Sequence, residues 1–310
     1  MRNTQSIFAL SGFLLIALLV PMIVSEYWIH VIIIAYFYAL LSTSWTLLAG
    51  YAGQFSFAHM AFCAIGAYTS GFLSLYTSIP IYINIIFGGM MAVFFGVFIG
   101  KLVLKIRGPY LALFTIAFAE LLRIAITAEH KITRGDFGLE VPALFSGISK
   151  SPYYYTMLGI LVISVFIMWI IINSDAGLYF RSIRENEDAA SSLGVNFIRY
   201  KIIAFSISSF FAGIAGAFYG HYVLVLSPNM VRISEMGIVI AMSVIGGIES
   251  LAGAFAGALI VEFISEYLRD YGEWRLVIFG LLLIITLRFA KNGLIYPLLR
   301  VFKSKERHPS

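Results

Sequence analysis

Long runs of apolar residues dominate the chain, and short polar stretches separate them. Ten runs can be traced, at residues 7–25, 28–49, 54–75, 80–100, 109–127, 153–173, 200–225, 234–247, 251–269 and 273–290. Most approach the ~20 apolar residues with which an α-helix crosses a bilayer. The pattern predicts an all-α, polytopic transmembrane bundle of about ten spans. It forms one domain over residues 1–302, followed by a disordered tail over residues 303–310.

The eighth run is the shortest, and it ends at the consecutive glycines Gly246 and Gly247. We expect a bent, broken or re-entrant segment near Gly247, because irregular backbone at membrane depth is tolerated only against protein or a water-filled cavity. The first run, residues 7–25, imitates a signal peptide, but no A-x-A-like cleavage site follows it. We interpret it as the first span.

Composition excludes a soluble domain. Only 12% of the 310 residues are charged and mean hydropathy is +0.92, whereas a soluble domain has about 25% charged residues. The lone Cys63 excludes an internal disulfide and a cysteine-based metal cluster. No G-x-x-x-x-G-K-[ST] loop is present, so the chain is not expected to hydrolyse ATP itself. We expect a non-catalytic protein with no cofactor and no nucleic-acid partner.

The basic residues predict how the chain is oriented. If the N-terminus lies inside and the spans alternate, 14 of the 21 Lys and Arg residues fall on the cytoplasmic side and six outside, with Arg123 inside a span. Cytoplasmic loops of membrane proteins carry an excess of Lys and Arg. Both termini are therefore expected in the cytoplasm.

The longest predicted cytoplasmic segment, residues 174–200, contains the charged stretch RSIRENEDAASSLG at residues 181–194. Three carboxylates stand near the start of its predicted helix, where they suit the helix dipole: Glu185, Glu187 and Asp188. Ala189 and Ala190 favour helix and present a small face. Gly194, with Asn196, indicates the end of the helix. From the residues alone, an ordinary charged loop explains this stretch equally well.

Several blocks resemble a known family. Residues 183–194, I-R-E-x-E-x-A-A-x-x-x-G, look like the coupling loop of ABC importer permeases. Other blocks are similar to branched-chain amino-acid permeases of the LivM type: GYAGQFSFAHMAF at 50–62, RGPYLALFTIAFAE at 107–120, RYKIIAFSISSFFAGIAGAFYG at 199–220, and SPNM leading into GGIESLAGAFAGA within 227–258. The blocks occur in the order found in that family and extend from about residue 50 to the last span.

The resemblance implies the membrane-spanning subunit of an ATP-driven importer for branched-chain or related small amino acids, in the inner membrane of a prokaryote. It implies as partners cytoplasmic ATP-binding subunits, a homologous permease and a periplasmic or extracellular solute-binding protein. Relatives that carry urea and small amides keep those solutes open as an alternative. The loop at 181–199 would dock on an ATPase, and the residues implied in that coupling are Arg184, Glu185, Glu187, Ala189, Ala190 and Gly194. Asp188 departs from the family, which usually has an apolar residue there.

Three sets of polar residues are candidates for the translocation path or its gate, and the third is Glu249. Gln54, Ser56 and His59 follow a predicted bend at Gly50–Gly53, and they line a pathway or make hydrogen bonds between helices. Glu120 and Arg123 are three residues apart on one helix face, so they are expected to pair, either as structural support or as a gate.

Glu249 follows the Gly246-Gly247 break. At the position of Glu249 the resembling family usually has glycine. Glu249 is either solvated in a cytoplasmic vestibule or, at membrane depth, sensitive to protons or cations. The second possibility belongs to a rival function. An ion-gradient-driven transporter or channel would use intramembrane ionisable groups, for which the candidates are Glu120, Arg123, Glu249 and Glu262.

Overall fold

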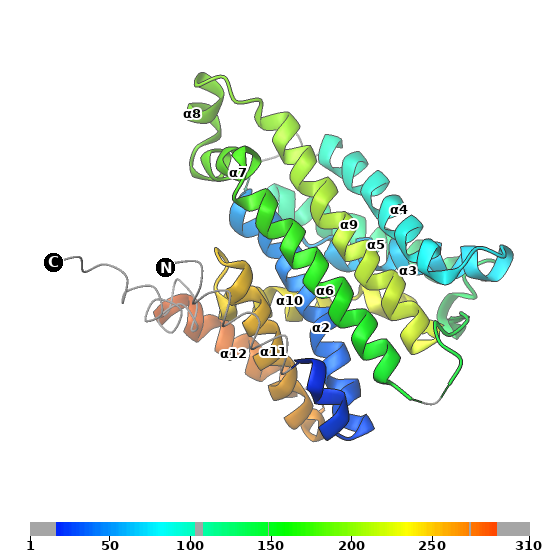
Figure 1. Cartoon of the computed structure of the whole chain (residues 1–310). Coiled ribbons are helices and arrows are strands. Elements are labelled where there is room, and N and C mark those ends of the chain that lie inside the picture. The colour runs from blue at the N-terminus through cyan, green and yellow to red at the C-terminus, as the bar shows by residue number, and fades with distance from the viewer. Residues whose placement is uncertain (1–16, 103–107, 148, 273, 290–310) are drawn as a thin grey trace.

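A computed structural model describes residues 17–102, 108–147, 149–272 and 274–289, which form a bundle of α-helices (Figure 1). The predicted all-α class is confirmed by the helices that fill most of these ranges. The first predicted span falls partly within them, and residues 17–23 are helical. The predicted tail at 303–310 lies outside the described residues.

Most helices follow one another with short connections, and the segment between α5 and α6, residues 129–150, is the longest. The α-helices are α2 Glu26–Thr46, α3 His59–Tyr76, α4 Ile81–Leu102, α5 Pro109–Ala128, α6 Ser151–Ile172, α7 Asp175–Glu185, α8 Glu187–Ser192, α9 Phe197–Val223, α10 Ile233–Gly246, α11 Leu251–Tyr267 and α12 Trp274–Phe289. A π-helical segment, η1 Leu47–Tyr51, continues α2. Short 3-10 turns are η2 Gly135–Phe137, η3 Pro228–Val231 and η4 Arg269–Tyr271, and the strands are β1 Leu139–Glu140 and β2 Val225–Leu226.

Five helices of the described residues are long and apolar enough to cross a membrane: Glu26–Tyr51, Ile81–Leu102, Pro109–Ala128, Ser151–Ile172 and Phe197–Val223. The other helices at predicted spans are shorter or less apolar. The expected number of about ten spans therefore stays a prediction. Large apolar side chains remain exposed on α4, α5 and α6, among them Phe94, Leu121 and Ile163. Such faces suit lipid or another membrane subunit.

The eighth predicted segment forms α10, which is short and ends at the predicted break. Its 14 residues extend about 21 Å, less than the ~30 Å hydrocarbon core of a bilayer. Most of it is buried, and Ser243 Oγ lies 2.8 Å from Ser42 Oγ of α2. A Cβ on Gly246 would lie 2.0 Å from the carbonyl oxygen of Gly253. Small residues thus bring α10 and α11 into backbone contact.

The bundle has two ends that differ in structure, and contacts between residues far apart in the sequence hold the first of them together. At one end β1 pairs with β2, and Leu139 stands opposite Leu226. His221 fixes the same region, because its Nδ1 lies 2.7 Å from the Pro142 carbonyl oxygen and its Nε2 lies 2.9 Å from Ser70 Oγ. We call this the β1–β2 end. At the opposite end α7 and α8 extend beyond the bundle (Figure 1), and we call it the α8 end.

Glycines let α3, α4 and α9 approach closely near the middle of the bundle. A Cβ on Gly66 of α3 would lie 2.1 Å from the carbonyl oxygen of Gly213 in α9. A Cβ on Gly216 would lie 1.9 Å from the carbonyl oxygen of Cys63, and one on Gly88 of α4 would lie 2.6 Å from that of Gly66. Close backbone approach through small residues is how membrane helices gain packing contacts. These three helices therefore form a tightly packed unit.

Candidate functional site

The charged segment at the α8 end folds as two helices, where a single one was predicted. Asn186 separates them. Its backbone is extended, and its side-chain oxygen accepts hydrogen bonds from the amides of Asp188 and Ala189, each 3.0 Å long. Asparagine is among the best N-cap residues, so it ends α7 and starts α8. The prediction that Glu185 stands at the start of the helix is therefore wrong, because Glu185 ends α7.

Gly194 ends the segment as predicted. Its φ is +86°, a conformation that glycine adopts without strain. Its amide donates to the Ser191 carbonyl at 2.9 Å, and the Val195 amide donates to the Ala190 carbonyl at 3.1 Å. Asn196, in contrast, belongs to the next helix, because its side chain accepts a hydrogen bond from the Arg199 amide at the start of α9. The backbone turns sharply here, and α8 stays short.

The two alanines of α8 face opposite ways. Ala190 is only 2% exposed and packs inward, while Ala189 is exposed. Leu193, directly after α8, is 85% exposed. The outward surface of α8 thus carries small residues and the Asp188 side chain, beside the exposed apolar side chain of Leu193.

Glu187 points into the protein and forms an ion pair with Lys201 of α9. The Lys201 side chain is 1% exposed and its Nζ lies 5.6 Å from the centre of the Phe197 ring. A buried charge is tolerated only when it is paired. Glu187 therefore anchors α8 to the start of α9.

Replacing Glu187 with glutamine is expected to lower the free energy of unfolding by about 3 kcal/mol, because the buried Lys201 charge loses its partner. Thermal unfolding of the purified protein in detergent measures the change. Replacing both residues with methionine removes both charges and is expected to restore most of the stability. Equal stability of Glu187→Gln and the original chain would contradict the anchoring role.

Arg184 makes contacts with two distant parts of the chain and with the neighbouring Glu185. Its Nη1 donates to the Gly50 carbonyl of η1 at 2.7 Å and lies 3.1 Å from Glu249 Oε1. Its Nη2 donates to Glu185 at 2.7 Å. Arg184 thus ties α7 both to η1 and to the turn between α10 and α11.

Glycines make room for this arrangement. A Cβ on Gly50 would lie 1.7 Å from the carbonyl oxygen of Ile248, so only glycine lets η1 touch the α10–α11 turn. Gly53 has φ +69°, and the nearest atom to a Cβ there would be Cγ of Arg184, at 3.0 Å. The predicted bend at Gly50–Gly53 is therefore where α7, η1 and the α10–α11 turn meet.

Glu249 lies in the turn after α10, where its side chain is 68% exposed and paired with Arg184. It lies at the α8 end, between the eighth and ninth predicted runs. Its exposure fits the solvated alternative, and its depth in the membrane stays a prediction.

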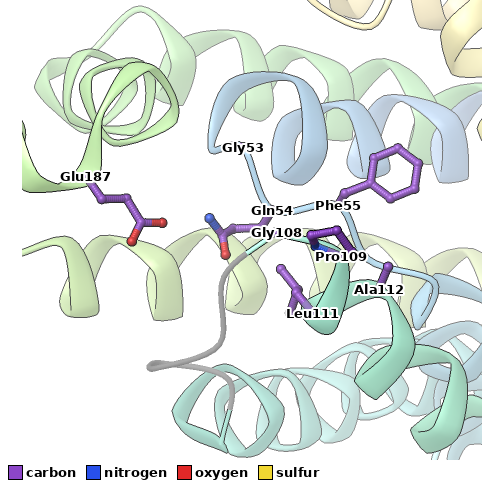
Figure 2. Close-up of a pocket in the computed structure, with 8 residues that line it drawn as sticks. All are labelled: Gly53, Gln54, Phe55, Gly108, Pro109, Leu111, Ala112 and Glu187. Carbon is purple, nitrogen blue, oxygen red and sulfur yellow. The ribbon is translucent and has the colours of Figure 1, made fainter.

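A pocket of about 280 Å³ opens beside this junction. Its lining residues are Gly53, Gln54, Phe55, Gly108, Pro109, Leu111, Ala112 and Glu187. Figure 2 shows the Glu187 carboxylate reaching across the pocket toward the Gln54 side chain, with the start of α5 on the other side. The pocket joins one predicted pathway residue, Gln54, to one predicted coupling residue, Glu187.

Ser56 and His59 lie apart from this pocket. Ser56 was predicted on the first turns of a span, but α3 begins only at His59 and residues 52–58 are irregular. The Ser56 carbonyl accepts a hydrogen bond from Trp45 Nε1 at 2.8 Å, and its hydroxyl accepts one from the Ala58 amide. His59 is fully buried, with its ring edge-on to Phe62. Both residues pack the junction between α2 and α3.

Glu120 and Arg123 pair within α5, as their spacing predicts. Arg123 Nε lies 3.0 Å from both carboxylate oxygens of Glu120. Their side chains are 45% and 29% exposed. The pair lies on a helix with a largely exposed apolar surface, and within the described part of the chain no hydrogen bond or ion pair joins it to the coupling residues. Its gating role stays a prediction.

Sequence reasoning missed three features of this site. Lys201 was counted as one more cytoplasmic charge, although a single lysine four residues after Phe197 at the start of an apolar run is a possible signal for a buried pair. The contact between Arg184 and the Gly50 carbonyl has no local signal, because 134 residues separate them. The pocket has no local signal either, because Gly108 and Pro109 line it together with Gln54 and Glu187, which lie far from them in the sequence.

Comparison with known proteins identifies the family. A family model described as "Branched-chain amino acid transport system / permease component" matches residues 27–287. The chain is 28% identical to the high-affinity branched-chain amino acid transport system permease protein LivM of Escherichia coli K12, over 92% of this chain and 74% of the relative.

Two further relatives agree. LivH of Escherichia coli K12, named as a permease protein of the same transport system, is 26% identical over 83% of this chain and 91% of its own length. The probable LivM of Methanocaldococcus jannaschii is 22% identical over 62% of this chain and 61% of its own length. No solved structure matches. The chain belongs to the family of permease components of branched-chain amino acid transport systems.

Proposed function

We propose that this permease is one of two membrane-spanning subunits of an ATP-driven importer, and that α8 docks on a cytoplasmic ATPase. The second subunit is a homologous permease, and a periplasmic or extracellular binding protein delivers the solute. The chain itself catalyses no reaction. ATP binding closes the ATPase pair, α8 moves with it, and the spans of residues 1–302 shift between two openings.

The observation that carries the proposal is the position and the support of α8. It is a six-residue helix that extends beyond the bundle (Figure 1). It is nevertheless held firmly, through Glu187 to Lys201 and through Arg184 to η1 and Glu249. A flexible solvated loop has no use for a buried ion pair beneath it. A helix that receives force from a partner needs such anchors.

This function sets the orientation of the chain in the inner membrane of a prokaryote. The α8 end faces the cytoplasm, because the ATPase is there. The basic residues agree, since Arg181, Arg184, Arg199 and Lys201 all lie in or beside α7 and α8. An excess of Lys and Arg marks cytoplasmic segments. An even number of spans then places both termini on the cytoplasmic side.

Branched-chain or related small amino acids are the solute class that the names of the relatives support. Urea and small amides are the alternative. Competition for leucine uptake separates them: an excess of isoleucine or valine is expected to suppress uptake, while an excess of urea or acetamide leaves it unchanged. The opposite result would assign the amide class.

The decisive experiment measures leucine uptake in cells that express the complete transporter. On this proposal, uptake continues when a protonophore removes the proton gradient, provided that ATP is maintained, and it stops when ATP is depleted. An ion-gradient-driven transporter gives the reverse pattern. Cells that express only the partner subunits are the control for background uptake.

A further inference from the structure

We propose that Arg184 is a positioning residue that passes the movement of α8 to the two breaks in the membrane helices, η1 and the α10–α11 turn. This inference deepens the proposed function and rests on it. It assigns to one side chain the step between the docking helix and the bundle.

Arg184 is close to α8 in the chain. Only Glu185 and Asn186 separate it from Glu187, the first residue of α8. Asn186 is fixed by its two capping hydrogen bonds to α8, so α8 cannot turn freely about this connection. A displacement of α8 therefore reaches the end of α7, where Arg184 lies.

The guanidinium then reaches both breaks. One bond, 2.7 Å long, ends on the Gly50 carbonyl, and the ion pair with Glu249 measures 3.1 Å. The two breaks also touch each other, because Gly50 lies against the Ile248 carbonyl. Arginine offers five donors in a rigid planar fork, which allows one side chain to hold several acceptors at fixed angles. Lysine has a single flexible ammonium and cannot hold all of them in this geometry.

The backbone that Arg184 holds is irregular. Within η1 the hydrogen bonds deviate from the α-helical ladder: the Ala52 amide donates to the Leu47 carbonyl at 3.3 Å, and the Gln54 amide donates to the Leu48 carbonyl at 3.0 Å. Short π-helical segments inside α-helices occur often at functional positions. At the other break, Gly247 has φ +119°. Displacing either segment costs fewer regular hydrogen bonds than displacing a continuous helix.

A displaced η1 also changes the pocket wall. Gly53 and Gln54 follow directly after η1 and line the pocket that Glu187 borders. The same movement of α8 thus acts on the pocket from two sides, directly through Glu187 (Figure 2) and through Arg184 by way of Gly50.

The first test compares ATP hydrolysis with solute uptake in the complete transporter, reconstituted in vesicles with L-leucine as the probe. For Arg184→Gln we expect leucine taken up per ATP hydrolysed to fall about tenfold, in the range of measured coupling between sites, while hydrolysis stays within about twofold. Arg232→Gln removes an exposed arginine between η3 and α10, outside the 181–199 loop, and is expected to leave the ratio unchanged. Hydrolysis and uptake that fall together, or that both stay unchanged, would overturn the inference.

The second test removes any dependence on transport. Spin labels are attached at Ser191→Cys in α8 and Ala252→Cys at the start of α11, both exposed positions, with buried Cys63 replaced by serine. In the otherwise unchanged chain we expect one narrow distance distribution between the labels, because Arg184 holds α7 against the α10–α11 turn. Arg184→Gln is expected to broaden it. The same narrow distribution in both proteins would overturn the inference.

The two measurements separate this inference from the proposed function. If an ion gradient drove uptake, the unchanged transporter would take up leucine without hydrolysing ATP. The proposed function would then be wrong. The label distances would still report whether Arg184 holds the two segments together. A broadened distribution with an unchanged uptake-to-hydrolysis ratio would leave the contact real and refute its role in coupling.

Discussion

Replacing Gly66 with alanine is expected to destabilise the permease by about 3 kcal/mol, the cost of forcing an extra carbon into a filled contact. The new Cβ would lie 2.1 Å from the Gly213 carbonyl oxygen, and its other near atoms are also backbone of α9. Backbone cannot rotate away as a side chain can, so α3 and α9 must separate. The midpoint of thermal unfolding in detergent is expected to fall accordingly.

Gly159 of α6 provides the matched control, because nothing lies within 4 Å of a Cβ built there. Alanine is favoured over glycine in a helix by up to about 1 kcal/mol. Gly159→Ala is therefore expected to leave the unfolding midpoint unchanged or to raise it slightly. Were both variants to unfold at the same temperature, close packing of α3 on α9 would have to be abandoned.

Replacing Ala189 with arginine is expected to abolish ATP-driven leucine uptake while leaving the fold intact. Ala189 is exposed on α8, so the larger side chain can extend into solvent without disturbing the core. If α8 docks in a groove of the ATPase, an arginine there blocks the contact. Loss of a central interface contact costs at least about 2 kcal/mol, which weakens binding roughly 30-fold. Uptake and co-purification of the ATPase with the permease measure the two consequences.

The control for this substitution lies at the β1–β2 end. Ser78 is exposed between α3 and α4, and Ser78→Arg adds the same side chain far from α8. It is expected to retain both uptake and the ATPase. Normal co-purification of the ATPase with Ala189→Arg would refute docking through α8. Glu187 is less suitable for this test, because replacing it also removes the ion-pair partner of the buried Lys201 and so destabilises the fold.

Much of the fold could be predicted because membrane-spanning helices are recognisable from the length and apolar composition of their sequence runs. The long runs that became α4, α5, α6 and α9 were predicted within a few residues at most ends. The start of α3 was misplaced, since Phe55 and Phe57 extend an apolar run across backbone that is not helical. Hydropathy reports burial from water and does not distinguish a helix from irregular backbone packed against protein.

The candidate site was predicted only as far as local patterns allow. The glycine stop at Gly194 and the pairing of Glu120 with Arg123 follow from spacing within one helix or turn. The break at Asn186 was missed because a capping asparagine and a helical asparagine look alike in a charged stretch. Arg184, Gly50 and Glu249 come from three distant segments, and their meeting depends on tertiary packing, which no single stretch encodes.

The short length of α10 has a consequence for how the protein is made. A segment of 14 residues that extends about 21 Å does not reach across a ~30 Å hydrocarbon layer, so it makes a poor independent insertion unit for the translocon. Its backbone contact with α11 through Gly246 and Gly253 supplies the missing partner. We therefore expect insertion of α10 into the bilayer to depend on its contact with α11.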